Sequence, residues 1–308
     1  MRRSVIDVGS NSVLLLVAEQ RDGIWTPICE DTAITALGEG TKKTGLLSET
    51  AMVRTLEAVH RFVAKAKELG SPNTLVGATM AARIATNANE FLTKARDQGT
   101  PIFILTGEQE AQLGFESVIS DPMFATHPRI SILDPGGQST EVIVAERASS
   151  GPQVLFKQSF PVGTLGLKSS FFPDEEATGI QILRASSAID EIVGTCYQPN
   201  DCGVVVALGA AGTNLVSIRD RLAHWQPDKV HGAQLSFEEI SNAVGNLMHR
   251  TDQERADIVG MEKGREKTIH IGALLLERLL FALRAEKCFV SIRGWRHALL
   301  EKGSLEPL

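Results

Sequence analysis

The sequence contains little of what disulfide-stabilised, thiolate-metal and membrane proteins depend on. Four of its 308 residues are cysteines, and they form no CxxC pair and no metal-ligand spacing with histidine: Cys29, Cys196, Cys202 and Cys288. We therefore expect scattered, reduced thiols. No stretch approaches the roughly 18 uninterrupted apolar residues that a membrane span requires, so we predict a cytoplasmic protein without membrane contact.

Basic and aromatic side chains are also in short supply. The chain has 31 lysines and arginines against 37 acidic residues, a formal net charge of −6, and only 5% aromatic residues. A non-specific binder of nucleic acid or of an acidic membrane needs a dense excess of basic residues, and base stacking needs aromatic rings. We therefore expect small ligands and proteins as partners, and no nucleic acid.

What is present is typical of a globular chain, with 43% hydrophobic residues and enough length for two domains. Strands alternate with helices, which predicts the α/β fold class. Capping-box spacings, in which Thr or Ser precedes Gln or Glu by three residues, mark helix starts at Thr106, Ser236 and Thr251. The aperiodic segment 121–128 predicts a boundary between a domain at 1–124, joined by the C-terminal helix within 295–308, and a domain at 125–294.

The elements expected in each half can be given by residue number. Strands are predicted at 4–7, 13–19, 73–78, 102–105, 130–133, 141–145, 154–160, 204–208 and 288–292. Helices are predicted at 48–70, 89–98, 106–118, from about Asp174 to Tyr197, after Ser236, after Thr251, near Lys267 and at 295–301.

An internal repeat is the most informative feature. The segment Asp7-Val8-Gly9-Ser10-Asn11-Ser12 recurs as Asp134-Pro135-Gly136-Gly137-Gln138-Ser139, at an offset of 127 residues. In both copies a strand ends in Asp, a Gly- and Ser-rich turn follows, and an apolar strand leaves the turn. One such unit is therefore expected in each predicted domain.

Such a turn suits phosphate chemistry. Glycine lets backbone N–H groups curl around an anion, hydroxyl groups add donors, and the Asp can hold a divalent cation directly or through water. Two turns facing each other across a cleft between the domains would grip a phosphoryl group from both sides. The alternative is a pair of β-hairpins with ordinary turn residues. Duplication at a constant offset favours the functional interpretation.

Sequence blocks that resemble those of a known protein family extend nearly from end to end of the chain, and two of them contain the turns described above. They are IDVGSNSVLLLVAE at Ile6, LGEGTKKTGLLSE at Leu37, ATMAARIATN at Ala78, TGEQEAQLGF at Thr106, ILDPGGQSTEVIVAE at Ile132, FPVGTLGLKSSFF at Phe160, VALGAAGTNL at Val206, VHGAQLSFEEI at Val230 and RADIVGMEKGRE at Arg255. In these blocks the chain resembles the exopolyphosphatase and guanosine pentaphosphate phosphohydrolase (Ppx/GppA) family, within the actin-like ATPase and sugar-kinase superfamily. The resemblance implies two actin-like (ribonuclease H-like) domains with a phosphate-binding cleft between them.

The resemblance also implies an activity. Members of the family remove the terminal phosphate from inorganic polyphosphate or from guanosine pentaphosphate (pppGpp), with a divalent cation that is usually Mg²⁺. Glu110 resembles the catalytic glutamate that deprotonates the attacking water, and Arg83 resembles a phosphate-contacting arginine. Asp134 and Glu141 match the acidic pair tied to the metal, and Asp7 is the equivalent acid of the first turn. The turns match the phosphate-binding loops, here Gly9, Ser10, Asn11, Ser12, Gly136, Gly137, Gln138, Ser139 and Thr140.

Taken without the resemblance, these residues have plainer explanations. Glu110 lies in the first turn of a predicted helix, where a carboxylate is favourable for the helix dipole alone. Arg83 could be a surface charge or half of an ion pair. Asp134 could simply cap its turn.

Several departures from the family pattern keep other functions open. Pro135 removes one backbone donor from the second turn, Gln138 replaces a glycine there, and Gly166 replaces an arginine. Gln109 stands where a glutamate is common. The alternatives are a non-catalytic phosphate or alarmone sensor and an ATP-dependent kinase of the same superfamily. A homodimer is also an open expectation.

The choice between polyphosphate and the alarmone depends on where the basic side chains lie. A long polyphosphate would need them concentrated along the cleft, whereas dispersed cations would favour the shorter alarmone. The six candidates are Lys42, Lys43, Arg83, Lys168, Arg255 and Arg265.

Overall fold

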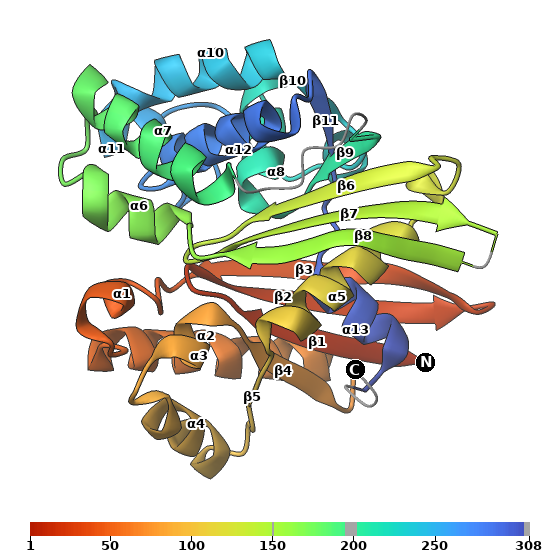
Figure 1. Ribbon diagram of the computed structural model, residues 1–308. Helices are drawn as coiled ribbons and strands as arrows, with labels where there is room; N and C mark the ends of the chain where they lie inside the picture. The colour runs from red at the N-terminus through yellow and green to blue at the C-terminus, as the bar shows by residue number, and fades with distance from the viewer. Residues whose placement is uncertain (150, 195–201, 305–308) are drawn as a thin grey trace. The chain divides into compact units, whose positions relative to one another are not determined.

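The computed structural model describes residues 1–149, 151–194 and 202–304. The chain forms two compact units (Figure 1). Unit 1 comprises Met1–Ser117 together with the chain from Trp295 onward, and unit 2 comprises Val118–Gly294. Among the described residues, no helix combines the length and the apolar character that crossing a membrane would require.

Unit 1 is built around a sheet whose described strands follow the order β3-β2-β1-β4-β5. β1 pairs antiparallel with β2 and parallel with β4. The strands are β1 (Arg2–Val8), β2 (Ser12–Arg21), β3 (Ile24–Ile34), β4 (Thr74–Ala78) and β5 (Phe103–Ile104). The helices are α1 (Thr41–Thr44), α2 (Glu49–Glu68), α3 (Met80–Ile84), α4 (Ala88–Asp97), α5 (Gly107–Ile119, whose last residues belong to unit 2) and α13 (Trp295–Lys302).

Both faces of the unit 1 sheet are apolar, because side chains alternate along each strand and helices cover each side. On one face, Ile6 and Leu15 are buried against α2 and α4. On the other, Val5 and Leu16 pack with Leu113 of α5 and with Trp295 and Leu299 of α13. The result is a three-layer α/β/α arrangement in which the last described helix completes a core begun by the first strand.

Unit 2 repeats this topology. The described strands of its sheet follow the order β10-β11-β9-β6-β7-β8, so β6, β7, β8 and β9 are connected and ordered as β1, β2, β3 and β4 are in unit 1. The strands are β6 (Arg129–Pro135), β7 (Thr140–Ala148), β8 (Gly151–Phe160), β9 (Val204–Ala207), β10 (Gln234–Ser236) and β11 (Lys287–Val290). The helices are the 3₁₀ turn Pro122–Phe124, α6 (Thr164–Phe171), α7 (Gly179–Val193), α8 (Gly209–Arg219), α9 (Pro227–Val230), α10 (Phe237–Met248), α11 (Asp252–Ala256) and α12 (Ile269–Leu283).

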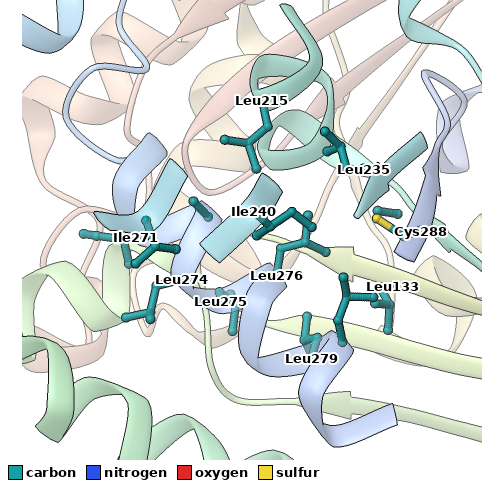
Figure 2. Close-up of a cluster of buried hydrophobic side chains, with 14 of the residues drawn as sticks. Leu133, Leu215, Leu235, Ile240, Ile271, Leu274, Leu275, Leu276, Leu279 and Cys288 are labelled. Carbon is teal, nitrogen blue, oxygen red and sulfur yellow. The ribbon is translucent and has the colours of Figure 1, made fainter. Parts of the chain in front are cut away.

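The core of unit 2 centres on α12, eleven of whose fifteen residues are buried. Leu274, Leu275 and Leu276 are all buried, as a helix surrounded by α6, α7, α8, α10 and β6 requires. Figure 2 shows these leucines together with Leu133 from β6 and Ile240 from α10. This core supports β6, and so it supports the strand that ends at the second turn.

The sequence pattern predicted many of these elements. The predicted capping boxes form at Ser236 with Glu239 and at Thr251 with Glu254. β3, α6 and α8 were not predicted. β3 is a half-exposed edge strand that contains Pro27, so it lacks an alternating pattern. α8 begins Gly-Ala-Ala-Gly, a weak helix signal that its burial overrides.

One helix boundary was wrong. The predicted helix from Asp174 begins instead at Gly179, because Thr178 and Gln181 form a capping box that fixes the start. Its predicted end at Tyr197, like Cys196, lies outside the described residues. The three described cysteines, Cys29, Cys202 and Cys288, are free thiols, and burial raises the pKa of the Cys288 thiol to about 12.

Candidate active site

The two predicted turns have the same geometry. The Gly9 amide donates to the Ser12 carbonyl at 2.9 Å, and the Gly136 amide donates to the Ser139 carbonyl at 2.9 Å. Each hydrogen bond closes a hairpin, β1–β2 in unit 1 and β6–β7 in unit 2. The sequence repeat is therefore also a structural repeat.

The first turn is braced by the chain that follows β3. The Asn11 carbonyl accepts hydrogen bonds from the amides of Thr35 and Ala36, and the Ser10 carbonyl accepts one from Gly38. Ser10 and Asn11 are buried. The turn is thus held by its carbonyl groups, an arrangement in which backbone N–H groups can be presented to an anion.

The second turn is braced by the start of α6. The Gly136 and Gly137 carbonyls accept hydrogen bonds from the amides of Thr164 and Leu165 at 3.0 and 2.7 Å. A side chain at Gly163 would lie 2.5 Å from the backbone of Gly137 and Gln138, so only glycine fits there. Gly163 is a structural requirement of the turn, and it stands in the FPVGTLGLKSSFF block, where no neighbouring residue indicates this role.

Two carboxylates meet at the second hairpin. Asp134 on β6 and Glu141 on β7 are cross-strand partners, so their side chains project from the same face of the sheet. Glu141 is buried, with 4% of its surface exposed. At the equivalent place in unit 1, Asp7 is opposite Leu14. The two hairpins therefore differ in chemistry, and the acidic pair belongs to the second alone.

This acidic pair has the chemistry of a magnesium site. Mg²⁺ prefers oxygen ligands, keeps several waters, and is usually bound through one or two carboxylates together with substrate phosphates. Adjacent like charges on a sheet repel each other, and a cation would relieve that repulsion. Within the described residues, no group of three or more His, Cys, Asp and Glu side chains could hold a metal ion by itself. A two-carboxylate site completed by substrate is consistent with both observations. The assignment of Asp7 as a further metal ligand stays a prediction.

Arg83 and Glu110 are brought together in unit 1. The Arg83 Nη1 donates to Glu110 Oε2 at 3.2 Å and to the Leu105 carbonyl at 2.7 Å. Both side chains are mostly buried, with 22% and 12% of their surfaces exposed. The contact joins α3, the end of β5 and the first turn of α5, so two residues that sequence similarity identified separately form one ion pair.

Two departures from the family pattern have local explanations. Gln109 forms the predicted capping box with Thr106. The backbone N–H of Thr106 donates to Gln109 Oε1 at 2.9 Å, and the side-chain oxygen of Gln accepts this hydrogen bond as well as a carboxylate would. Pro135 pairs with Thr140 at the end of β6, and its carbonyl lies on the side of Gly209, away from β7. Its missing N–H therefore does not interrupt the β6–β7 ladder.

One of the six candidate phosphate-binding cations was wrong. Arg255 is completely buried, and its guanidinium donates to the carbonyls of Leu247, Arg250, Glu175 and Glu266. Arg255 stabilises the packing of unit 2, and because it is fully buried it cannot contact a polyphosphate. By contrast, Lys42 and Lys43 lie on α1, which contacts the helix α3 that carries Arg83.

Comparison with known proteins identifies the family. The model of the Ppx/GppA phosphatase family matches residues 16–305. The chain belongs to the Ppx/GppA phosphatase family. The solved structure of the Aquifex aeolicus Ppx/GppA family member superposes with a TM-score of 0.80 at 28% identity, covering 98% of this chain and 97% of that one. The predicted α/β class with two actin-like domains is thereby confirmed.

Curated relatives of the family carry two different names. Exopolyphosphatase 2 of Mycobacterium tuberculosis is 23% identical over 97% of this chain and 96% of its own length. The guanosine-5'-triphosphate,3'-diphosphate pyrophosphatase of Vibrio cholerae is 26% identical over 96% of this chain and 58% of its own. The chain thus spans about half the length of some curated relatives that it matches, 43% in one case.

Proposed function

We propose that this Ppx/GppA member removes the terminal phosphate from inorganic polyphosphate or guanosine pentaphosphate with a divalent cation. The observation that carries the proposal is the pair of equivalent glycine–serine turns, of which the second bears Asp134 and Glu141 in register. The names of the curated relatives support both substrates. Both substrates end in a phosphoanhydride-linked phosphate.

The residues present can supply what phosphoryl transfer requires. Such reactions need positioning and charge neutralisation more than covalent catalysis. In the proposed mechanism the backbone and hydroxyl donors of the two turns, including Ser12 and Ser139, bind phosphate oxygens. Asp134 and Glu141 would hold Mg²⁺, which would neutralise phosphate charge there.

The Arg83–Glu110 pair supplies the base of the proposed mechanism. Glu110 accepts a proton from the water that attacks the terminal phosphorus. The Arg83 guanidinium is fixed by the Leu105 carbonyl and in turn fixes the direction of the Glu110 carboxylate. A positioned general base contributes about 10²- to 10⁴-fold to rate, which sets the loss expected when it is removed.

The test is phosphate release by the purified chain from polyphosphate and from guanosine pentaphosphate, with Mg²⁺ and with EDTA. Glu110→Gln should lower kcat by about 10²- to 10⁴-fold on whichever substrate is turned over. Glu116→Gln is the matched control, because Glu116 lies on the same helix but pairs with Lys302. Full activity of Glu110→Gln would contradict the assignment of the base.

The same experiment separates the alternatives. Tight binding of the alarmone with no phosphate release from either substrate would overturn hydrolysis in favour of a sensor. ATP consumption that depends on an added alcohol acceptor would instead identify a kinase.

A further inference from the structure

We propose that Ser159 is a positioning residue for the divalent cation, acting through Glu141. The inference rests on the proposed function, in which Glu141 is a ligand of the cation. Ser159 lies on the edge strand β8, directly opposite Glu141 in the β7–β8 register. Asp134, Glu141 and Ser159 therefore form one row across β6, β7 and β8, with their side chains on the same face of the sheet.

The contact within this row is short and involves a charge. The Ser159 hydroxyl donates to Glu141 Oε1 at 2.7 Å. An O–H group bonded to a carboxylate at this distance makes a charge-assisted hydrogen bond, roughly twice as strong as a neutral one. Because the hydroxyl engages one named oxygen, it fixes the rotation of the carboxylate and so the direction in which Glu141 presents its oxygens.

Ser159 contributes little to the packing of unit 2. Ser159 itself is exposed, whereas Glu141 is buried with 4% exposure. Loss of the hydroxyl would therefore leave no cavity, and its effect would pass through the carboxylate. This separates a positioning role from a packing role.

The first hairpin provides an internal comparison. At the same offset of 127 residues, unit 1 has Leu14 opposite Thr32. That row retains a hydroxyl residue but lacks the second carboxylate. Of the two hairpins, the one with two carboxylates is also the one in which a hydroxyl group holds a carboxylate. This is expected if Ser159 is an outer-shell partner of a metal ligand.

The proposal is tested by metal binding to the intact chain without substrate. Mn²⁺ is the probe, because it shares the preference of Mg²⁺ for carboxylate oxygens and its free ion can be measured by EPR. Loss of an outer-shell partner typically weakens metal affinity about 10- to 100-fold, so Ser159→Ala should raise the Mn²⁺ Kd by that factor. Ser159→Thr keeps the hydroxyl and should bind close to wild type. Thr32→Val, at the equivalent place in unit 1, is the matched control and should leave the Kd unchanged.

Activity gives a second readout. In Ser159→Ala the Mg²⁺ concentration for half-maximal phosphate release should rise, while kcat at saturating Mg²⁺ is retained. Its melting temperature in EDTA should equal that of the wild type. If Ser159→Ala melts at a lower temperature than the wild type in EDTA, the side chain stabilises the fold itself. That result would mean a structural role and would overturn the proposal.

Glu141→Gln separates the positioning role of Ser159 from the metal-ligand role of Glu141. If Glu141→Gln weakens Mn²⁺ binding and Ser159→Ala does not, the positioning role of Ser159 is wrong and the metal assignment stands. If neither variant changes Mn²⁺ affinity, the metal assignment itself is wrong, and the role of Ser159 falls with it. Equal weakening in Ser159→Ala and Ser159→Thr would also overturn the role of the hydroxyl.

Discussion

Arg83 donates to the carboxylate of Glu110, a residue 27 positions further along the chain, at 3.2 Å. The guanidinium is simultaneously anchored on the Leu105 carbonyl. Family similarity suggested that Arg83 contacts phosphate, whereas the structure shows it holding the proposed base. These roles have different kinetic consequences.

We expect Arg83→Met to lower kcat of phosphate release by about 10- to 100-fold with a smaller change in KM, because a small displacement of a catalytic group costs on that order. Steady-state kinetics on the preferred substrate measures the split. Lys94→Met, which removes an exposed pair with Glu49, is the control and should behave as wild type. An increase in KM with an unchanged kcat would show that Arg83 serves substrate binding alone.

Gly163→Ala should displace the second turn. Its new Cβ would lie 2.5 Å from backbone atoms of Gly137 and Gln138, which cannot rotate away as a side chain could. Overpacking of this kind costs about 1–3 kcal/mol, so we expect a lower melting temperature and a higher KM. Gly179→Ala, at the start of α7 with no atom within 4 Å, is the control and should be neutral or slightly stabilising. Wild-type KM in Gly163→Ala would contradict a role for this turn in substrate binding.

Arg255→Met should destabilise unit 2. The side chain is fully buried, and its loss would leave several carbonyl groups and the Asp252 carboxylate without their donor. Removing one partner of a buried ion pair costs about 3–5 kcal/mol, which chemical denaturation can measure. Arg219→Met removes a more exposed arginine and should cost about 1 kcal/mol or less. A stable Arg255→Met protein with weakened polyphosphate binding would restore the ligand role excluded above.

Acid should loosen the attachment of α13 in unit 1. Burial alone would raise the pKa of Glu30, but the adjacent His297 and Arg296, whose guanidinium donates to Glu30 Oε1 at 3.0 Å, outweigh burial and lower that pKa to about 2. Because the folded-state pKa lies below the ordinary value of 4.5, the stabilisation is complete above that value and is lost as pH falls from about 4.5 to about 2. At about 1.4 kcal/mol per pKa unit, the contribution is on the order of 3 kcal/mol.

The Glu30 prediction is checked by urea unfolding followed by tryptophan fluorescence, since Trp25 and Trp295 both lie in unit 1. Glu30→Gln should be less stable than wild type at neutral pH, and the gap should close on acidification. Glu49→Gln, which removes an exposed ion pair with Lys94 in the same unit, is the control. A gap that stays constant with pH would refute the assigned pKa.

Features determined by neighbouring residues were predicted well from the sequence. The hairpin turns, the capping boxes at Thr106, Ser236 and Thr251, and the strands on either side of Asp7 and Asp134 each depend on a few adjacent residues. The repeat extended these local predictions to the topology, because two copies of one motif implied two related sheets.

Features determined by distant residues were not predicted. The burial of Arg255 depends on carbonyl groups up to 80 residues away, and nothing beside it in the sequence indicates them. Similarly, the requirement for glycine at Gly163 arises from the backbone of Gly137 and Gln138. Sequence similarity could name Arg83 and Glu110, but only the fold shows that they form a pair.

The packing of α13 has a consequence for biosynthesis. Trp295 and Leu299 fill the face of the unit 1 sheet that includes Val5, and the Trp295 ring lies so close to Gly77 that a side chain there would meet it at 2.8 Å. The ribosome releases the first strand of this core early and its last helix only after the whole of unit 2 has been made. Unit 2 can thus fold as one uninterrupted stretch during translation, whereas unit 1 keeps part of an apolar face uncovered until α13 emerges.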